Sequence, residues 1–265
     1  MHYLFTKLNQ IKKLLGGKFI LLLLDYDGTL TPIVGTPGEA TISKRTRALL
    51  EKLSSSPDCK IGVISGRKLE DLKKIIGLED IIYAGNHGLE IEGPKIKFES
   101  QIPPQLKLII RNIAADIQKR LADIKGVLIE DKGLTLSIHY RLVSKKDMPA
   151  LKKVVTEVTS SYLASDKIKV NSGKKVYEIK PPIKWDKGKV ALWLLARQQF
   201  FSGAKDVLPV YLGDDLTDED AFAALKKRGL TVFVGRPGNS QADYYLKNTE
   251  EVTKFLHLIL DLQPD

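Results

Sequence analysis

Two groups of aspartates follow two apolar segments. Asp25 and Asp27 come directly after the apolar run Phe19 to Leu24, and the sequence GDDLTD at 213–218 follows a second apolar run. Carboxylates that converge on one place repel one another, so a partly dry cleft would need a cation between them. Oxygen ligands with room for water suit Mg²⁺. Either group alone could form a helix cap. Two groups at equivalent strand ends indicate a metal site, with Asp25, Asp27, Asp214, Asp215 and Asp218 as candidates.

A second kind of chemistry is indicated by residues that open predicted helices. Ser65, Gly66 and Arg67 follow the apolar segment KIGVI and precede a helical pattern. A hydroxyl beside free backbone N–H groups at such a place can bind phosphate, although an ordinary cap gives the same pattern. Lys187 also opens a predicted helix, where the helix dipole disfavours a cation. Its position is easier to explain if it neutralises a phosphate or a carboxylate.

The elements that must position these residues alternate between strand and helix. Short apolar runs bounded by turn residues predict buried strands, and the segments between them have helical spacing. This alternation predicts an α/β fold with a doubly wound, mainly parallel sheet, whose strand ends form the ligand site. Between residues 104 and 180 the pattern changes to αββαββ. We therefore expect a core formed by residues 1–103 and 181–265, with an inserted α+β domain at 104–180.

The net charge of +10 lies mostly within the inserted segment. A nucleic-acid binder could have this composition, and so could a surface that binds an anionic small molecule. Because the basic segment has few interleaved aromatic residues, we expect a small-molecule partner and no nucleic acid. The longest apolar run is far shorter than the roughly 20 residues of a membrane span, so we expect no membrane partner. One cysteine, Cys59, fits a reducing cytoplasm.

The motifs together resemble a known family. DYDGT at 25–29, Ser65, Lys187 and GDDLTD at 213–218 match, in order, the four motifs of the haloacid-dehalogenase-like phosphatases. Within that superfamily, the segments DYDGTLTPI, ISGR, AGNHGLE, EDKGLTLSIHYR and GKKVYEIKPPIKWDKGK resemble trehalose-6-phosphate phosphatases. The resemblance extends from about residue 18 to residue 247.

The resemblance implies a Mg²⁺-dependent phosphatase that works through an aspartyl-phosphate. Asp25 would be the nucleophile and Asp27 the general acid and base. Gly28 would allow a sharp turn, and Thr29 and Ser65, with Gly66, would hold phosphate oxygens. Lys187 would contact both the phosphate and Asp25. Mg²⁺ would be bound by Asp25, the carbonyl of Asp27 and Asp214, with Asp215 and Asp218 in support.

The inserted domain is a cap in the resembled family, where it closes over the site and recognises the sugar. Carboxylate and ammonium groups suit a polyhydroxyl sugar as acceptors and donors. The matching residues are Glu130, Lys132, Lys174 and Glu178. We expect His139 and Arg141 to support the cap rather than to do chemistry. His87, near the domain junction, is a further candidate, although a lone histidine is more often structural, and Arg67 is another.

Three alternatives remain at this point. The substrate could be another sugar phosphate, of the sucrose-phosphate or mannosyl-3-phosphoglycerate type, because only the cap would then differ. The chain could be a basic binding module for nucleic acid or acidic partners. It could also be an inactive regulator, but both Asp25 and Asp27 are present. We expect a cytoplasmic monomeric enzyme that performs the last step of trehalose biosynthesis.

Overall fold

The fold comes from a computed structural model that describes residues 1–203 and 206–263. The chain divides into two units: Met1–Glu99 together with Trp185–Asp265, and Ser100–Lys184. The predicted insertion at 104–180 falls inside the second unit.

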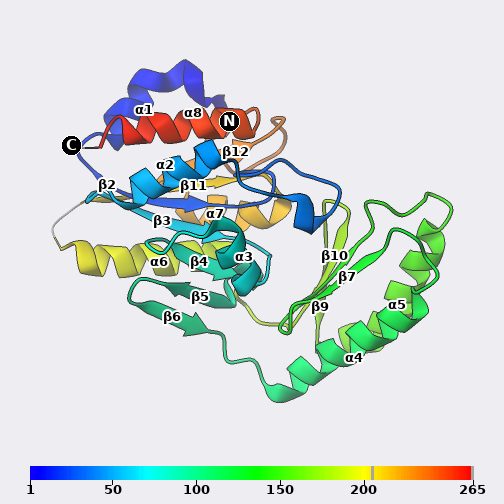
Figure 1. The fold of residues 1–265 in the computed structure, drawn as a ribbon. Coiled ribbons are helices and arrows are strands. Elements are labelled where there is room, and N and C mark those ends of the chain that lie inside the picture. The colour runs from blue at the N-terminus through cyan, green and yellow to red at the C-terminus, as the bar shows by residue number, and fades with distance from the viewer. Residues whose placement is uncertain (204–205, 264–265) are drawn as a thin grey trace. The chain divides into compact units, whose positions relative to one another are not determined.

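The first unit is built on a nine-stranded sheet with the order β1-β13-β12-β11-β2-β3-β4-β5-β6 (Figure 1). Strands from β1 to β4 in this order pair in parallel, and the last two, β5 and β6, pair antiparallel. The predicted mainly parallel sheet is therefore confirmed. Its strands are β1 His2–Tyr3, β2 Phe19–Leu24, β3 Cys59–Ile64, β4 Ile82–Gly85, β5 Glu90–Gly93, β6 Ile96–Glu99, β11 Val207–Gly213, β12 Leu230–Val234 and β13 Tyr244–Leu246.

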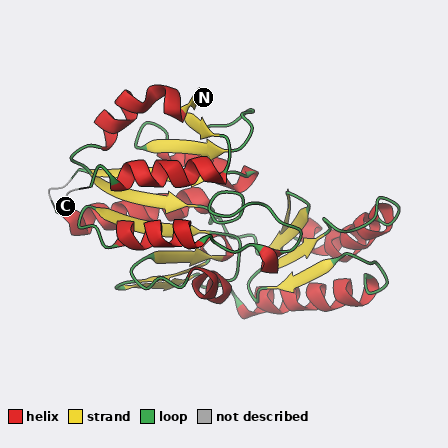
Figure 2. Cartoon of the chain, turned by 45° about the horizontal axis from the view of Figure 1, so that its top comes forward, coloured by secondary structure: helices red, strands yellow, loops and turns green. Residues whose placement is uncertain are grey.

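Helices cover both faces of this sheet, as Figure 2 shows after a turn of the view. Along β2, Ile20, Leu22 and Leu24 enter one hydrophobic cluster, while Leu21 and Leu23 enter the other. Successive side chains of a strand point to opposite faces, so a continuously apolar strand requires cover on both sides. The helices of the first unit are α1 Leu8–Leu15, α2 Lys44–Ser54, α3 Leu69–Ile76, α6 Lys187–Ser202, α7 Glu219–Leu225 and α8 Thr249–Leu260.

The second unit has the predicted order αββαββ. Helices α4 Pro104–Arg120 and α5 Met148–Ala164 pack on one face of a four-stranded antiparallel sheet with the order β7-β8-β10-β9. Its strands are β7 Leu128–Asp131, β8 Leu136–His139, β9 Lys169–Gly173 and β10 Val176–Lys180. Ile129, Ile138 and Ile179 lie in or against the hydrophobic cluster. The residues that alternate with them form the other face of the sheet.

Local signals in the sequence explain several element boundaries. Ser43 caps α2, accepting a hydrogen bond from the backbone N–H of Thr46 at 3.0 Å. Gly77 ends α3 in the left-handed conformation, which glycine adopts without strain. Among the helices that the structure describes, none is long and apolar enough to cross a membrane.

Candidate active site

The site lies at the carboxyl ends of three neighbouring strands, β11, β2 and β3. The backbone N–H of Asp25 continues the ladder beyond β2 and donates to the carbonyl of Leu212 at 2.9 Å. The backbone N–H of Ser65 does the same beyond β3, donating to the carbonyl of Ala84 at 2.9 Å. Because parallel strands end at one edge, segments that are distant in the sequence meet there.

The chain turns sharply after Asp27. Leu30 and Thr31 donate their backbone N–H groups to the carbonyl of Tyr26 at 2.9 and 3.1 Å. Gly28 has φ of +89°, in the region that side chains rarely adopt, and a Cβ there would overlap the carboxylate of Asp214. Glycine thus serves two purposes at this position: it permits the turn, and it leaves room between the two acidic segments.

Lys187 joins the two acidic groups. Its Nζ donates to Oδ1 of Asp25 at 2.6 Å and to Oδ1 of Asp218 at 2.7 Å. Lys187 is the first residue of α6, whose cap is Asp186. The predicted placement of this lysine at a helix start is confirmed, and its side chain contacts two carboxylates, one of the two explanations considered for it.

The Asp218 carboxylate is fully buried and accepts four hydrogen bonds. Oδ1 accepts from Lys187 and from the hydroxyl of Tyr211, and Oδ2 accepts from the backbone N–H groups of Asp214 and Asp215, each at 3.0 Å. A carboxylate offers about four lone-pair sites, so these donors saturate it. We therefore interpret Asp218 as a residue that orients Lys187 and the loop, rather than as a direct metal ligand.

Tyr211 is the residue that the sequence analysis missed here. It lies within β11, two residues before Gly213, and its hydroxyl donates to Asp218 at 2.7 Å. A tyrosine inside an apolar strand is normally interpreted as a residue of the hydrophobic core. Only its short distance in sequence from the GDD segment could have indicated a role in the site. Burial and the Asp218 carboxylate raise the pKa of Tyr211 well above its usual range, which keeps the hydroxyl a donor.

The charge balance of the cluster fits a divalent cation. Oxygen atoms of Asp25, Asp214 and Asp218 lie within 4.8 Å of one another, and all three residues are buried. Burial raises the pKa of Asp25 well above its usual range against the pull of Lys187, and Asp218 and Asp214 raise it further. Burial alone would lower the pKa of Lys187, but Asp218 and Asp25 raise it well above its usual range. Additional positive charge would therefore be needed to hold Asp25 ionised.

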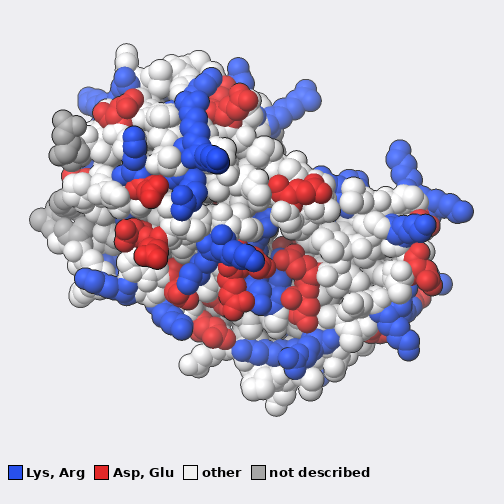
Figure 3. All heavy atoms as spheres, viewed as in Figure 1, with Lys and Arg blue, Asp and Glu red and all other residues white. Residues whose placement is uncertain are grey.

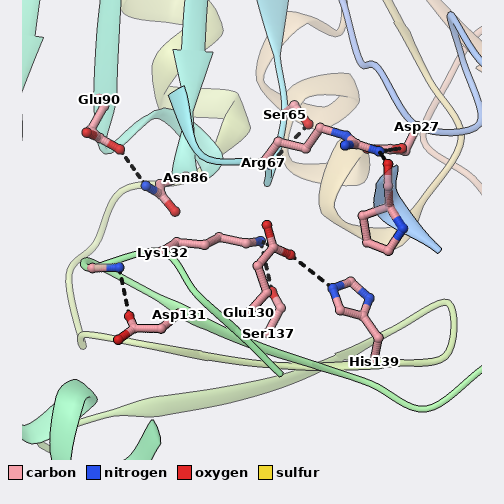
Figure 4. A network of polar contacts seen from close by, with 12 residues as sticks. Asp27, Ser65, Arg67, Asn86, Glu90, Glu130, Asp131, Lys132, Ser137 and His139 are labelled. Carbon is pink, nitrogen blue, oxygen red and sulfur yellow. Dashed lines mark hydrogen bonds and ion pairs between the residues drawn. The ribbon is translucent and has the colours of Figure 1, made fainter. Parts of the chain in front are cut away.

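Asp27 forms a bidentate ion pair with Arg67 (Figure 4). Nε of Arg67 donates to Oδ2 at 2.7 Å, and an Nη2–H group donates to Oδ1 at 2.6 Å. Arg67 is buried, whereas the Asp27 side chain is 42% exposed. The sequence singled out both residues, but nothing in it indicated that they would pair.

Thr29 carries the one buried side-chain oxygen that has no hydrogen-bond partner within residues 1–203 and 206–263. A buried hydroxyl without a hydrogen-bond partner costs free energy, so this hydroxyl indicates a ligand that accepts its hydrogen bond. Ser65 is buried as well, and its Oγ accepts from the backbone N–H of Arg67 at 3.2 Å. Both hydroxyls come from loops at the strand ends, as expected for phosphate contacts.

His87 belongs to a strained connection between β4 and β5. Asn86 and His87 have φ of 50° and 57°, and both are buried. Their backbone N–H groups donate to the carbonyls of Arg67 and Ser65 at 2.7 and 2.9 Å. Strain of this kind persists where the surroundings fix it, often beside functional sites. The connection thus holds the Ser65–Arg67 loop through its backbone.

The remaining acidic candidate, Asp215, caps a short turn. Its Oδ1 accepts from the backbone N–H of Leu216 at 2.8 Å, and with Asp218 it forms a capping box over Leu216–Asp218. This local role is the capping alternative considered above, and it places Asp215 in support of the loop.

In the second unit, three of the four sugar candidates share a setting. Glu130 and Glu178 both pair in register with Ser137, so they lie on the same face of the sheet, opposite the helices. Lys132 is buried and donates to Ser137 Oγ at 2.8 Å, while His139 Nε2 lies 3.0 Å from Glu130 Oε2 (Figure 4). Lys174 is exposed in the β9–β10 turn.

Comparisons with known proteins first define the fold class. A haloacid dehalogenase-like hydrolase from Bacteroides thetaiotaomicron superimposes with a TM-score of 0.63 at 18% identity, over 91% of this chain and all of that one, which shows a shared fold. The C-terminal domain of trehalose-6-phosphate phosphatase from C. albicans superimposes with a TM-score of 0.83 at 26% identity, over 98% of each chain.

Sequence comparison is more specific. The trehalose-phosphatase family model matches residues 23–250. Trehalose-phosphate phosphatase B of Arabidopsis thaliana is 36% identical over 257 residues, which cover 92% of this chain and 67% of the relative. The chain belongs to the trehalose-phosphatase family, and the predicted family, fold class and phosphatase activity are confirmed.

Proposed function

We propose that the protein hydrolyses trehalose 6-phosphate to trehalose and phosphate through a phosphoryl group carried on Asp25. The observation that carries this proposal is the buried cluster in which Lys187 contacts Asp25 at 2.6 Å and Asp218 at 2.7 Å. The family model spans both acidic segments and the second unit between them. Relatives named for trehalose phosphate support the choice of substrate.

The reaction would take place in two steps. In the first, an oxygen of Asp25 bonds to phosphorus, the bond from phosphorus to the sugar oxygen breaks, and a proton on Asp27 passes to that oxygen. In the second, a water oxygen bonds to phosphorus, its proton passes to Asp27, and the bond to Asp25 breaks. Both carboxyl groups then return to their starting states.

Other groups hold the phosphoryl oxygens. The hydroxyl of Thr29, which has no partner among the described residues, can donate a hydrogen bond to a phosphoryl oxygen, and Ser65 supplies a second hydroxyl. Lys187 supplies positive charge next to Asp25, which both stabilises the ionised nucleophile and attracts the phosphate. Gly66, between Ser65 and Arg67, keeps the loop free of a side chain where a phosphate would approach.

We propose Mg²⁺ as the cofactor, held by Asp25, the carbonyl of Asp27 and Asp214. When bound, it supplies charge that stabilises the phosphoryl group as negative charge develops during transfer. Asp218 and Asp215 serve this arrangement indirectly, because their carboxylates accept hydrogen bonds from Lys187, Tyr211 and the loop backbone.

For the sugar, we propose the polar face of the second unit's sheet. Glu130 and Glu178 flank Ser137 there, and Lys132 provides a buried ammonium group. Alternating acceptors and donors suit a disaccharide with many hydroxyl groups. Lys174, in the adjacent turn, would contribute charge from the edge, and His139 would hold Glu130 in place.

Surface charge agrees with a small-molecule partner. On the face drawn in Figure 3, basic and acidic side chains alternate and do not form one continuous basic surface. We propose a cytoplasmic monomer that binds a small sugar phosphate. The nucleic-acid alternative would require binding that weakens steeply with salt.

The experiment is phosphate release from a panel of sugar phosphates, with Mg²⁺ and after its removal by EDTA. We expect the highest kcat/KM with trehalose 6-phosphate and no turnover without a divalent cation. Preference for sucrose 6-phosphate or mannosyl-3-phosphoglycerate would keep the phosphatase mechanism and replace the substrate. Turnover that resists EDTA would contradict the metal assignment.

A further inference from the structure

The side chain of Arg67 is held in place by several contacts. Its guanidinium group donates to both oxygens of Asp27 and to the carbonyl of Pro37 at 2.8 Å. The group also lies over the ring of Tyr26, 5.1 Å from the ring centre, and its own backbone carbonyl accepts from Asn86 at 2.7 Å. The side chain is therefore a rigid support.

Asp27 is the movable member of the pair. Its side chain is 42% exposed, against 9% for Arg67. A carboxylate at the end of a sharp turn can leave a guanidinium group without disturbing the other contacts of that group. Planar, two-point contact with an arginine also fixes the orientation of a carboxylate more closely than a lysine would.

We propose that Arg67 is the positioning residue for Asp27 and serves proton transfer rather than phosphate binding. This inference rests on the proposed function, in which Asp27 gives a proton to the sugar oxygen and later takes one from water. The pair with Arg67 holds the Asp27 side chain in one place and one orientation for both transfers. Without it, the carboxylate would sample many rotamers at the exposed end of the turn.

Two other roles for Arg67 make different predictions. As a phosphate ligand, it would contribute to every substrate that carries a phosphoryl group. If it is a structural tie between the Ser65 loop and the loop that contains Pro37, replacing it would lower the free energy of unfolding and reduce all activities together. Only if Arg67 positions Asp27 should the loss of activity in Arg67 variants depend on how much the leaving group needs a proton.

The test compares two substrates in a first-turnover measurement. Trehalose 6-phosphate has a poor leaving group that needs a proton, whereas 2,4-dinitrophenyl phosphate releases a stable anion that does not. Arg67→Met should slow the first turnover of trehalose 6-phosphate by about 10-fold or more, and by no more than the whole contribution of acid–base catalysis, which is ~10²–10⁴-fold. The first release of dinitrophenolate should fall by less than about 3-fold.

A double-mutant cycle with Asp27→Asn sharpens the test. We expect the double variant to be no slower on trehalose 6-phosphate than Asp27→Asn alone, because both changes remove one function. Arg67→Lys keeps the charge but loses the two-point contact, so its rate should lie between wild type and Arg67→Met. If Arg67→Met folds poorly, Arg67→Lys can be used for the same comparison of substrates.

Arg47→Met is a matched control. Arg47 also binds backbone carbonyls, those of Ile76 and Gly77 at 2.9 and 2.7 Å, but it contacts no residue of the site in the hydrogen bonds described. It should lower the melting temperature without any dependence on the leaving group.

Three results would overturn the inference: equal losses on both substrates in Arg67 variants, additive losses in the double variant, or no loss at all. If Asp27→Asn itself showed no dependence on the leaving group, the proposed mechanism would fail instead. Arg67 variants that differ from Asp27→Asn in this respect would refute the positioning role and leave that mechanism standing.

Discussion

Lys187 and Asp25 are 162 positions apart in the chain, yet the lysine Nζ lies 2.6 Å from the Asp25 carboxylate and both side chains are buried. The whole second unit lies between them in the sequence. The contact depends on α6 beginning at Lys187, close to the end of β2, the strand that Asp25 follows. Such a pair, hidden from water, is costly to form without further partners, and Asp218 supplies one of them.

Gly28→Ala should remove activity by displacing the Asp214 carboxylate. An alanine Cβ would overlap that carboxylate, and φ of +89° would add strain. We expect a large loss in kcat and a higher Mg²⁺ requirement in steady-state assays. Gly17→Ala is the matched control, because Gly17 has φ of +70° with nothing within 4 Å of the added Cβ. It should cost stability alone, and an equal loss of activity in both variants would contradict the prediction.

Tyr211→Phe should lower both stability and kcat. Removing the hydroxyl deprives Asp218 of one donor, at a cost of about 1–3 kcal/mol, and loosens the hold on Lys187. We expect kcat to fall several-fold at unchanged KM, measured beside denaturant unfolding. Tyr83→Phe is the control, since its buried hydroxyl bonds only the backbone of Leu78, at 2.6 and 3.0 Å, in the contacts described. A Tyr211 variant that loses stability but keeps full kcat would show a purely structural role.

Mg²⁺ should stabilise the protein more strongly as pH rises from acidic to neutral. Burial raises the folded-state pKa of Asp25 above its ordinary value of 3.8, so the folded protein binds that proton more tightly than the unfolded chain does. The metal-free protein therefore loses stability as pH rises from the ordinary pKa of Asp25 to its raised pKa in the folded protein. The pKa of Lys187 is raised from 10.5, so its contribution stays constant across the same range.

Melting temperatures with saturating Mg²⁺ or EDTA, measured across pH, test this linkage. The difference between the two curves should widen with pH, and Asp214→Asn should shrink it. A difference that stays constant from acidic to neutral pH would refute the coupling between the cation and the carboxylates.

Glu130→Gln should separate sugar recognition from chemistry. The carboxylate lies 3.0 Å from His139 and 3.7 Å from Lys132, so the change weakens a charged contact for the sugar. We expect kcat/KM for trehalose 6-phosphate to fall about 10-fold, the equivalent of roughly 1–2 kcal/mol, with little change for an aryl phosphate. Glu157→Gln, a partly exposed glutamate on α5, is the control. Equal losses on both substrates would place Glu130 in folding instead.

The sequence predicted the parts of the site that follow from strand ends. Continuous apolar runs marked β2, β3 and β11, and parallel strands bring their carboxyl ends to one edge, so Asp25, Ser65 and Asp214 were expected together. The order αββαββ of the second unit followed from the change of pattern between residues 104 and 180. The short strands β1 and β13 were not expected, because two or three residues carry no detectable pattern.

Contacts between side chains were harder to predict. Arg67 and Asp27 are 40 positions apart, and their pairing depends on how two loops fold at the sheet edge. From the sequence alone, Tyr211 is interpreted as a core residue, because its contact with Asp218 is known only from the structure. The left-handed conformation of Asn86 and His87 likewise depends on packing, because asparagine and histidine adopt it more often than most residues but are not confined to it.

The central claim is that Asp25 carries the phosphoryl group. The most direct measurement is a rapid acid quench of the enzyme turning over ³²P-labelled trehalose 6-phosphate with Mg²⁺, followed by mapping of the labelled peptide. The account predicts a hydroxylamine-sensitive label on the peptide that contains Asp25, absent in Asp25→Asn, which should show no turnover. A label on another residue, or substantial turnover by Asp25→Asn, would contradict it.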